Sequence, residues 1–143
     1  MSSKIVRQIK IFKTGSRFLI PYSKIRRIVE RILLQEHAEK KFLNIIFVKE
    51  REILNLNKKF RSKKKVTDVL SFGFADEEIL GEVYVCYPQA KRQAFDWGVT
   101  FEQEILRLII HGVLQLLGYS HYRKKERKKM QEREHYYLVN VTV

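Results

Sequence analysis

Polar side chains recur at every fourth position along one apolar stretch of the sequence. Gln103, Arg107, His111 and Gln115 interrupt the mostly apolar residues 101–117. In a helix this spacing places the four side chains in one stripe. A buried stripe of polar groups must be hydrogen-bonded or must coordinate a ligand.

The stripe continues into a spacing that suits metal ligands. His111, Gln115, Gly118 and His121 stand at relative positions 0, 4, 7 and 10, the spacing of the zinc-binding helix and turn of the metzincins. Positions 0 and 4 share one helix face, the glycine permits a left-handed turn, and the last residue swings back toward the same ion. An amide oxygen binds a transition metal less well than imidazole does. The pattern predicts a metal site made by the two histidines and, more weakly, by Gln115; two hydrogen-bonded histidines without a metal are the alternative.

Gly112 occupies the position at which a metalloprotease of this type has its general base, a glutamate. The sequence therefore disfavours a metalloprotease.

Two basic clusters accompany this pattern. The first cluster precedes Thr67 and consists of Lys58, Lys59, Arg61, Lys63, Lys64 and Lys65; the second follows His121 and consists of Arg123, Lys124, Lys125, Arg127, Lys128 and Lys129. Such clusters can hold a phosphate backbone, although a solvated charged surface is the alternative for both. The 29 lysines and arginines exceed the 16 acidic residues by 13 charges, which favours a polyanionic partner, most simply nucleic acid.

Hydrophobic periodicity predicts the elements that position these residues. Strands are expected around residues 5–11, 42–48, 69–74 and 80–86, and helices over 25–33, 50–60, 88–95, 100–117 and 121–138. Ser23 is the expected cap of the first helix, and Thr100 with Gln103 has the capping-box pattern. Interspersed strands and helices predict an α+β fold with one sheet packed with helices.

Composition limits the class of protein. A length of 143 residues, of which 45% are hydrophobic, predicts a single domain over residues 1–143 and excludes a disordered tail. The single cysteine, Cys86, excludes an internal disulfide and fits a reducing compartment. Residues 105–117 are too short and too often interrupted to span a bilayer, and residues 1–13 lack a signal-peptide pattern. We therefore expect a cytoplasmic protein with neither a membrane nor a disulfide partner.

Three segments resemble the YbeY family of bacterial endoribonucleases. Residues 111–121, HGVLQLLGYSH, are similar to the family signature H-G-x-L-H-L-x-G-Y-D-H. Residues 56–72 resemble L-N-x-x-Y-R-x-K-D-x-x-T-D-V-L-S-F, and residues 80–83 resemble L-G-D-I/V. The chain departs from the family pattern at Gln115, where the family has histidine, and at Ser120, where it has aspartate.

The resemblance implies a mixed, mostly parallel four-stranded sheet with a zincin-like metal-site helix and turn. It implies cleavage of single-stranded RNA in the maturation of small-subunit (16S) ribosomal RNA and in ribosome quality control. The small ribosomal subunit and its assembly factors are the implied partners. A non-catalytic RNA-binding protein of ribosome assembly, with an eroded metal site, is the alternative.

The resemblance also implies roles for individual residues. One zinc ion or another divalent transition metal would be held by His111 and His121, weakly because of Gln115. Arg61 and His111 take the catalytic positions. The expected RNA-binding residues are Lys58, Lys59, Arg61, Lys63, Lys64, Lys65, Arg123 and Lys124.

Overall fold

A four-stranded mixed sheet forms the centre of the molecule. The computed structural model describes residues 8–15, 18–61 and 67–141, without the side chains of Arg61 and Val141. The sheet has the order β1-β2-β4-β3 and consists of β1 (Ile9–Lys13), β2 (Phe42–Val48), β3 (Val69–Gly73) and β4 (Ile79–Cys86). β1, β2 and β4 run parallel, and β3 pairs antiparallel to β4 at one edge. The predicted mixed, mostly parallel α+β fold is confirmed.

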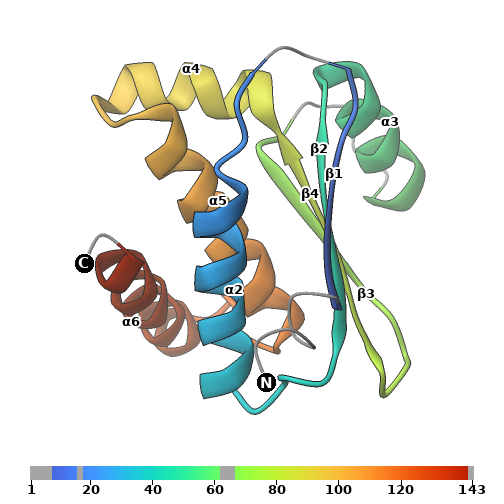
Figure 1. Ribbon diagram of the computed structural model, residues 1–143, viewed down its shortest axis with the longest axis vertical. Helices are drawn as coiled ribbons and strands as arrows, with labels where there is room; N and C mark the ends of the chain where they lie inside the picture. Colours follow the sequence, from blue (N-terminus) through green and yellow to red (C-terminus); the bar gives the residue numbers. More distant parts are fainter. Residues whose placement is uncertain (1–7, 16–17, 62–66, 142–143) are drawn as a thin grey trace.

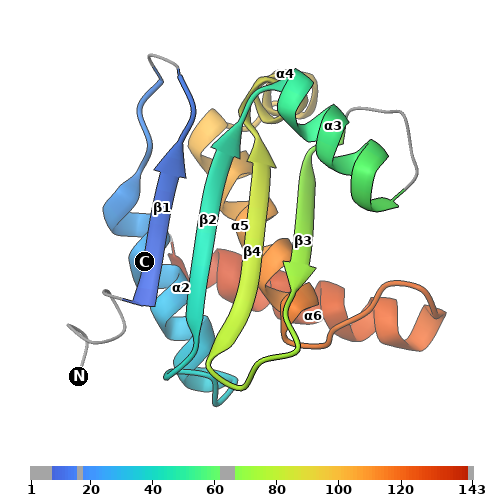
Figure 2. The ribbon, with the colours of Figure 1, turned by 90° about the vertical axis from the view of Figure 1, so that its right-hand side faces the viewer.

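Helices cover the two faces of the sheet unequally. The helices of the described part are α2 (Tyr22–Gln35), α3 (Glu50–Arg61), α4 (Tyr87–Trp97), α5 (Phe101–Leu116) and α6 (Lys124–Val141). Figure 1 shows α2, α5 and α6 on one side of the sheet and α3 on the other. Figure 2 shows β3 at the edge of the sheet, with the start of α6 projecting beyond it. Among the described residues, no helix is long and apolar enough to cross a membrane.

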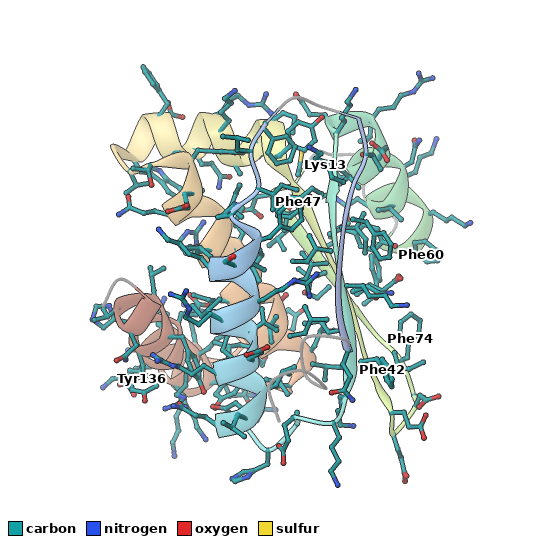
Figure 3. All side chains as sticks on the ribbon, in the orientation of Figure 1. Lys13, Phe42, Phe47, Phe60, Phe74 and Tyr136 are labelled. Carbon is teal, nitrogen blue, oxygen red and sulfur yellow. The ribbon has the colours of Figure 1, made fainter. Side chains whose placement is uncertain are left out.

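The hydrophobic core lies between the sheet and the larger helical layer. The apolar face predicted for the first helix is fully buried, from Ile25 to Leu33. Leu43, Ile45 and Phe47 alternate along β2 and join the same core, as side chains on one face of a strand must. Figure 3 shows Phe47 between the sheet and the helices. The burial of these side chains holds α2 and α5 against the sheet.

The contact between α5 and the sheet depends on a glycine. A Cβ at Gly112 would lie 2.7 Å from a methyl of Val83 on β4 and 3.1 Å from Oγ of Ser71 on β3. The Ser71 hydroxyl also donates a hydrogen bond to the Gly112 carbonyl at 3.1 Å. Only glycine fits this close approach. His111, the residue directly before Gly112 on α5, is therefore held close to the sheet.

Two predicted helix starts differ from the structure. α2 begins at Tyr22 after Pro21, with no side-chain cap, so the prediction that Ser23 caps it is wrong. α6 begins at Lys124 instead of His121. The Ser120 hydroxyl accepts a hydrogen bond from the backbone N–H of Tyr122 at 3.2 Å, and this local turn competes with helix at these residues. His121 consequently lies in a bend.

The other predicted elements agree closely with the structure. Thr100 and Gln103 form the complete capping box of α5, and the helix ends just before Gly118, whose φ is +102°. Glycine permits this backbone conformation, through which the chain leaves α5. The first strand spans Ile9–Lys13, and Ile5 lies outside the described residues.

Candidate functional site

A polar cavity of about 290 Å³ lies where β3, α5 and the turn after α5 meet. Its lining residues are Asn57, Thr67, Asp68, Val69, Leu70, Ser71, His111, Gln115, His121 and Tyr122. Asn57 and residues 67–71 belong to the second motif, whereas His111, Gln115 and His121 belong to the signature and Tyr122 directly follows it. The fold thus brings two motifs that are about forty residues apart in the sequence to one cavity.

A carboxylate on α6 holds the ring of His111. Nδ1 of His111 donates a hydrogen bond to Oε1 of Glu134 at 2.6 Å, and both side chains are mostly buried. With Nδ1 engaged, Nε2 is the ring nitrogen left for a ligand in the cavity. Metal-binding histidines characteristically have such a carboxylate on their second nitrogen, which fixes the tautomer and ring orientation.

His121 and Gln115 lie beside His111. The ring centroids of His111 and His121 are 5.7 Å apart, with 37° between the planes. The amide nitrogen of Gln115 lies 3.4 Å from Nδ1 of His121. The turn after α5 therefore returns His121 to the helix face that carries the other two residues, as the spacing predicts.

Two histidines and a glutamine are ligands that suit a divalent transition metal, with the glutamine as the weakest of the three. Within the described residues, no three histidine, cysteine or acidic side chains converge as metal ligands. The side chains of His111, His121 and Gln115 line the same cavity, and Glu134 already orients the first imidazole. These residues fit such an ion, but with less affinity than three imidazoles, because the amide is the poorer ligand.

A buried polar network supports the β3 wall of the cavity. Glu104 on α5, which is 1% exposed, accepts two hydrogen bonds from Arg107, each at 2.8 Å. The amide of Gln93 on α4 donates to Glu104 at 2.6 Å and to Asp68 at 3.3 Å. The hydrogen bonds to Glu104 raise the pKa of Arg107. The network ties the cavity residue Asp68 to both α4 and α5.

A second network holds the turn that carries His121. Glu36, at the end of α2, accepts hydrogen bonds from the hydroxyls of Tyr119 at 2.8 Å and Tyr137 at 2.7 Å. Arg133 on α6 donates to the same carboxylate at 2.7 Å. Burial opposes the ionisation of Glu36, but the three hydrogen bonds outweigh it and lower the pKa below 4.5. Tyr119 anchors the turn between Gly118 and His121 through this carboxylate.

Comparison with known proteins identifies the family. The chain matches the family of Endoribonuclease YbeY over residues 12–142. The chain belongs to the YbeY family. Endoribonuclease YbeY of Thermotoga maritima is 38% identical over 119 residues, covering 82% of this chain and 76% of that protein. The protein of the same name from Aquifex aeolicus is 44% identical over 101 residues, covering 67% of each chain.

A solved structure supports the fold assignment. The solution structure of a Thermotoga maritima protein superimposes with a TM-score of 0.69 at 34% sequence identity. The match covers 93% of this chain and 88% of that one. The YbeY resemblance inferred from three short motifs therefore extends over most of the fold.

The structure describes some of the predicted site residues and not others. His111, Gln115 and His121 line one cavity. Lys58 and Lys59 are exposed at the end of α3, and Arg123 and Lys124 are exposed directly after Tyr122. The side chain of Arg61 and the residues Lys63, Lys64 and Lys65 lie outside the described part.

Sequence reasoning missed the residues that support the ligands. Glu134 lies on the same face of α6 as the buried Met130 and Tyr137, at a spacing of four and three residues. An acidic residue on a buried helix face was a usable signal that it has a partner. Asn57, which lines the cavity and is 2% exposed, matches the asparagine of the second family motif, but the adjacent Lys58 and Lys59 gave no sign that its side chain is buried.

Proposed function

We propose that this YbeY-family chain is a metal-dependent endoribonuclease that cleaves single-stranded RNA. We further propose that it is a single domain over residues 1–143 that works in the cytoplasm. Its proposed role is the maturation of small-subunit (16S) ribosomal RNA and ribosome quality control, with the small subunit and its assembly factors as partners. The observation that carries the proposal is the pair His111 and His121 at one cavity, the first held by Glu134.

The proposed ligands of the ion, zinc or another divalent transition metal, are His111, His121 and Gln115. Glu134 keeps His111 in the tautomer that presents Nε2 to the cavity. The Glu36–Tyr119 contact sets the turn from which His121 reaches the same space. When bound, such an ion supplies Lewis-acid chemistry toward a phosphoryl oxygen or a water.

The proposed phosphate-binding group is Arg61 with the lysines around it. Asn57, one helical turn before Arg61, lines the cavity, and so does Thr67 at the far end of the basic segment. The described residues that flank the segment thus line the cavity on both sides of it in the sequence. A guanidinium binds phosphate oxygens bidentately and stabilises charge that develops during cleavage. Lys58, Lys59, Lys63, Lys64, Lys65, Arg123 and Lys124 would hold the strand on either side.

The test combines metal analysis with RNA cleavage. Wild-type protein and the Gln115→His variant are passed through gel filtration, and bound metal is measured by elemental analysis. Restoring a third imidazole should raise the retained metal. Gln131→His, which adds the same side chain on an exposed part of α6, is the matched control. Equal amounts of retained metal in wild type and Gln115→His would show that Gln115 is not the weak ligand of the site.

Cleavage decides between the two functions. Wild-type protein is incubated with single-stranded and duplex RNA of the same sequence, with added zinc or with a chelator. The proposal requires cleavage of the single strand that the chelator abolishes. RNA binding without metal-stimulated cleavage would favour the alternative, a non-catalytic RNA-binding protein of ribosome assembly. The alternative is supported by the described residues, in which no three histidine, cysteine or acidic side chains come together as metal ligands.

A further inference from the structure

Trp97 is an exposed aromatic residue that contacts the polar stripe of α5. It is the single tryptophan of the chain, it ends α4, and 58% of its surface is exposed. The guanidinium carbon of Arg107 lies 5.1 Å from the centre of its ring. A large apolar side chain in this position has no role in the hydrophobic core, and one face of it is supported by a cation.

Arg107 connects Trp97 with the cavity. It lies one helical turn before His111 in the polar stripe of α5, and its guanidinium is 3.9 Å from the carboxylate of Asp68, which lines the cavity. The two hydrogen bonds to Glu104 already fix its orientation. Trp97 is therefore held by a network that exists before any ligand binds.

A second exposed aromatic residue stands at the opposite end of the stripe. Tyr122 is 79% exposed and lines the cavity. Its ring is stacked on His121, with centroids 5.0 Å apart and 26° between the planes. From Arg107 to Gln115 the stripe is about 12 Å long, at about 1.5 Å per helical residue. Two aromatic rings thus flank the proposed metal ligands.

We propose that a single RNA strand runs along the polar stripe of α5 and stacks one base on Trp97 and another on Tyr122. This inference rests on the proposed function and specifies how its substrate is held. Exposed aromatic rings beside basic residues are the usual means of binding single strands, since every base has a face that can stack. Arg123 and Lys124 follow Tyr122 directly and are exposed, so they can contact the phosphates there.

The arrangement gives a physical reason for a preference for single strands. Bases in a duplex are already stacked on their neighbours, and their faces cannot reach side chains on a protein surface. A single strand can turn its bases onto Trp97 and Tyr122 while its backbone passes His111. Discrimination against duplex RNA would then arise during binding as well as at the cleavage step.

Trp97 itself reports on the contact. A single-stranded RNA of about ten nucleotides, a length within the range that one small domain covers, is titrated into wild-type protein while tryptophan fluorescence is recorded. A chelator keeps the strand intact. Saturable quenching is expected with the single strand, and inorganic polyphosphate, which has charge but no bases, should bind without quenching. Binding of the strand with unchanged emission would overturn the inference.

Variants separate stacking from general loss of structure. Trp97→Ala should weaken RNA binding roughly tenfold, the effect of one lost stacked base, whereas Trp97→Phe should retain most of the affinity. Phe95→Ala is the matched control, because Phe95 is on the same helix and is 88% exposed. Melting temperatures establish that each variant is folded. Equal losses for Trp97→Ala and Phe95→Ala would contradict a specific platform.

The same measurements distinguish this inference from the proposed function. If wild-type protein shows quenching by RNA but never cleaves it with metal present, the nuclease proposal fails and the stacking path stands. If it cleaves RNA while Trp97→Ala binds and cleaves as wild type does, the nuclease stands and the stacking path is wrong. Tyr122→Ala, tested in the same way, should lower RNA affinity by a similar factor.

Discussion

Replacing Glu36 with glutamine should loosen the whole C-terminal half of the site. The carboxylate joins α2, α6 and the turn before His121 through hydrogen bonds from Tyr119, Tyr137 and Arg133. A hydrogen bond to an ionised group contributes about 1.5–3 kcal/mol, and such contributions are not additive within one network. Because glutamine retains one acceptor oxygen, we expect the free energy of unfolding to fall by about 2–4 kcal/mol at neutral pH.

The effect should depend on pH in a defined direction. The hydrogen bonds lower the pKa of Glu36 in the folded protein below the ordinary 4.5, against the opposing effect of burial. A group with a lowered folded pKa stabilises the protein above its unfolded pKa, and this stabilisation is lost as the pH falls through the folded pKa. The difference in the free energy of unfolding between wild type and Glu36→Gln is therefore largest near neutral pH. It decreases only below the ordinary pKa of glutamate.

Urea unfolding at about pH 7 and about pH 3 measures this difference. Glu132→Gln, an exposed position on α6, removes the same charge outside the network and serves as the control. Retained metal after gel filtration should also fall in Glu36→Gln, because Tyr119 anchors the turn that carries His121. An equal loss of stability at both pH values, or equal losses in the two variants, would refute the reasoning.

Three further predictions concern packing and RNA. Gly112→Ala should cost about 1–3 kcal/mol in urea unfolding, because its Cβ would lie 2.7 Å from a methyl of Val83; unchanged stability would contradict the close helix–sheet contact. If about four phosphates are bound, log K for single-stranded RNA should fall with log salt at a slope near −3, and replacing Lys63, Lys64 and Lys65 with glutamine should flatten it; a salt-independent affinity would exclude the electrostatic account. Arg61→Lys should lower single-turnover cleavage roughly 10²-fold while RNA affinity is kept, and wild-type cleavage by the folded variant would exclude a catalytic role.

Local patterns in the sequence predicted most of the fold. The apolar run of β2, the apolar face of α2 and the capping box of α5 each depend on residues within a few positions of one another, and each is present in the structure. The start of α6 was misplaced by three residues because the Ser120–Tyr122 turn competes with the helix. The mixed, mostly parallel four-stranded sheet came from the family resemblance, and the order of its strands is known only from the structure, since periodicity does not encode which strands are neighbours.

In the candidate site, too, the residues on one local element could be predicted and those on distant elements could not. His111, Gln115 and His121 could be found because one helix and one turn carry all three. Their supports come from distant elements: Glu134 is 23 residues from His111 in the sequence, and Glu36 is 83 residues from Tyr119. Spacing rules describe neighbours on one element, so contacts of this kind become visible only when the fold brings the elements together.

Gln115 changes the number of strong ligands without disturbing what holds the others. Glu134 orients His111 from α6, and Glu36 anchors the turn of His121 from α2, and neither contact involves the side chain of Gln115. Gly112 fixes α5 against β3 and β4 independently of both. A histidine introduced at position 115 would therefore enter a framework that already positions the other two rings. For this reason the weakness of the proposed metal site should lie in the missing imidazole itself, and one substitution should be sufficient to correct it.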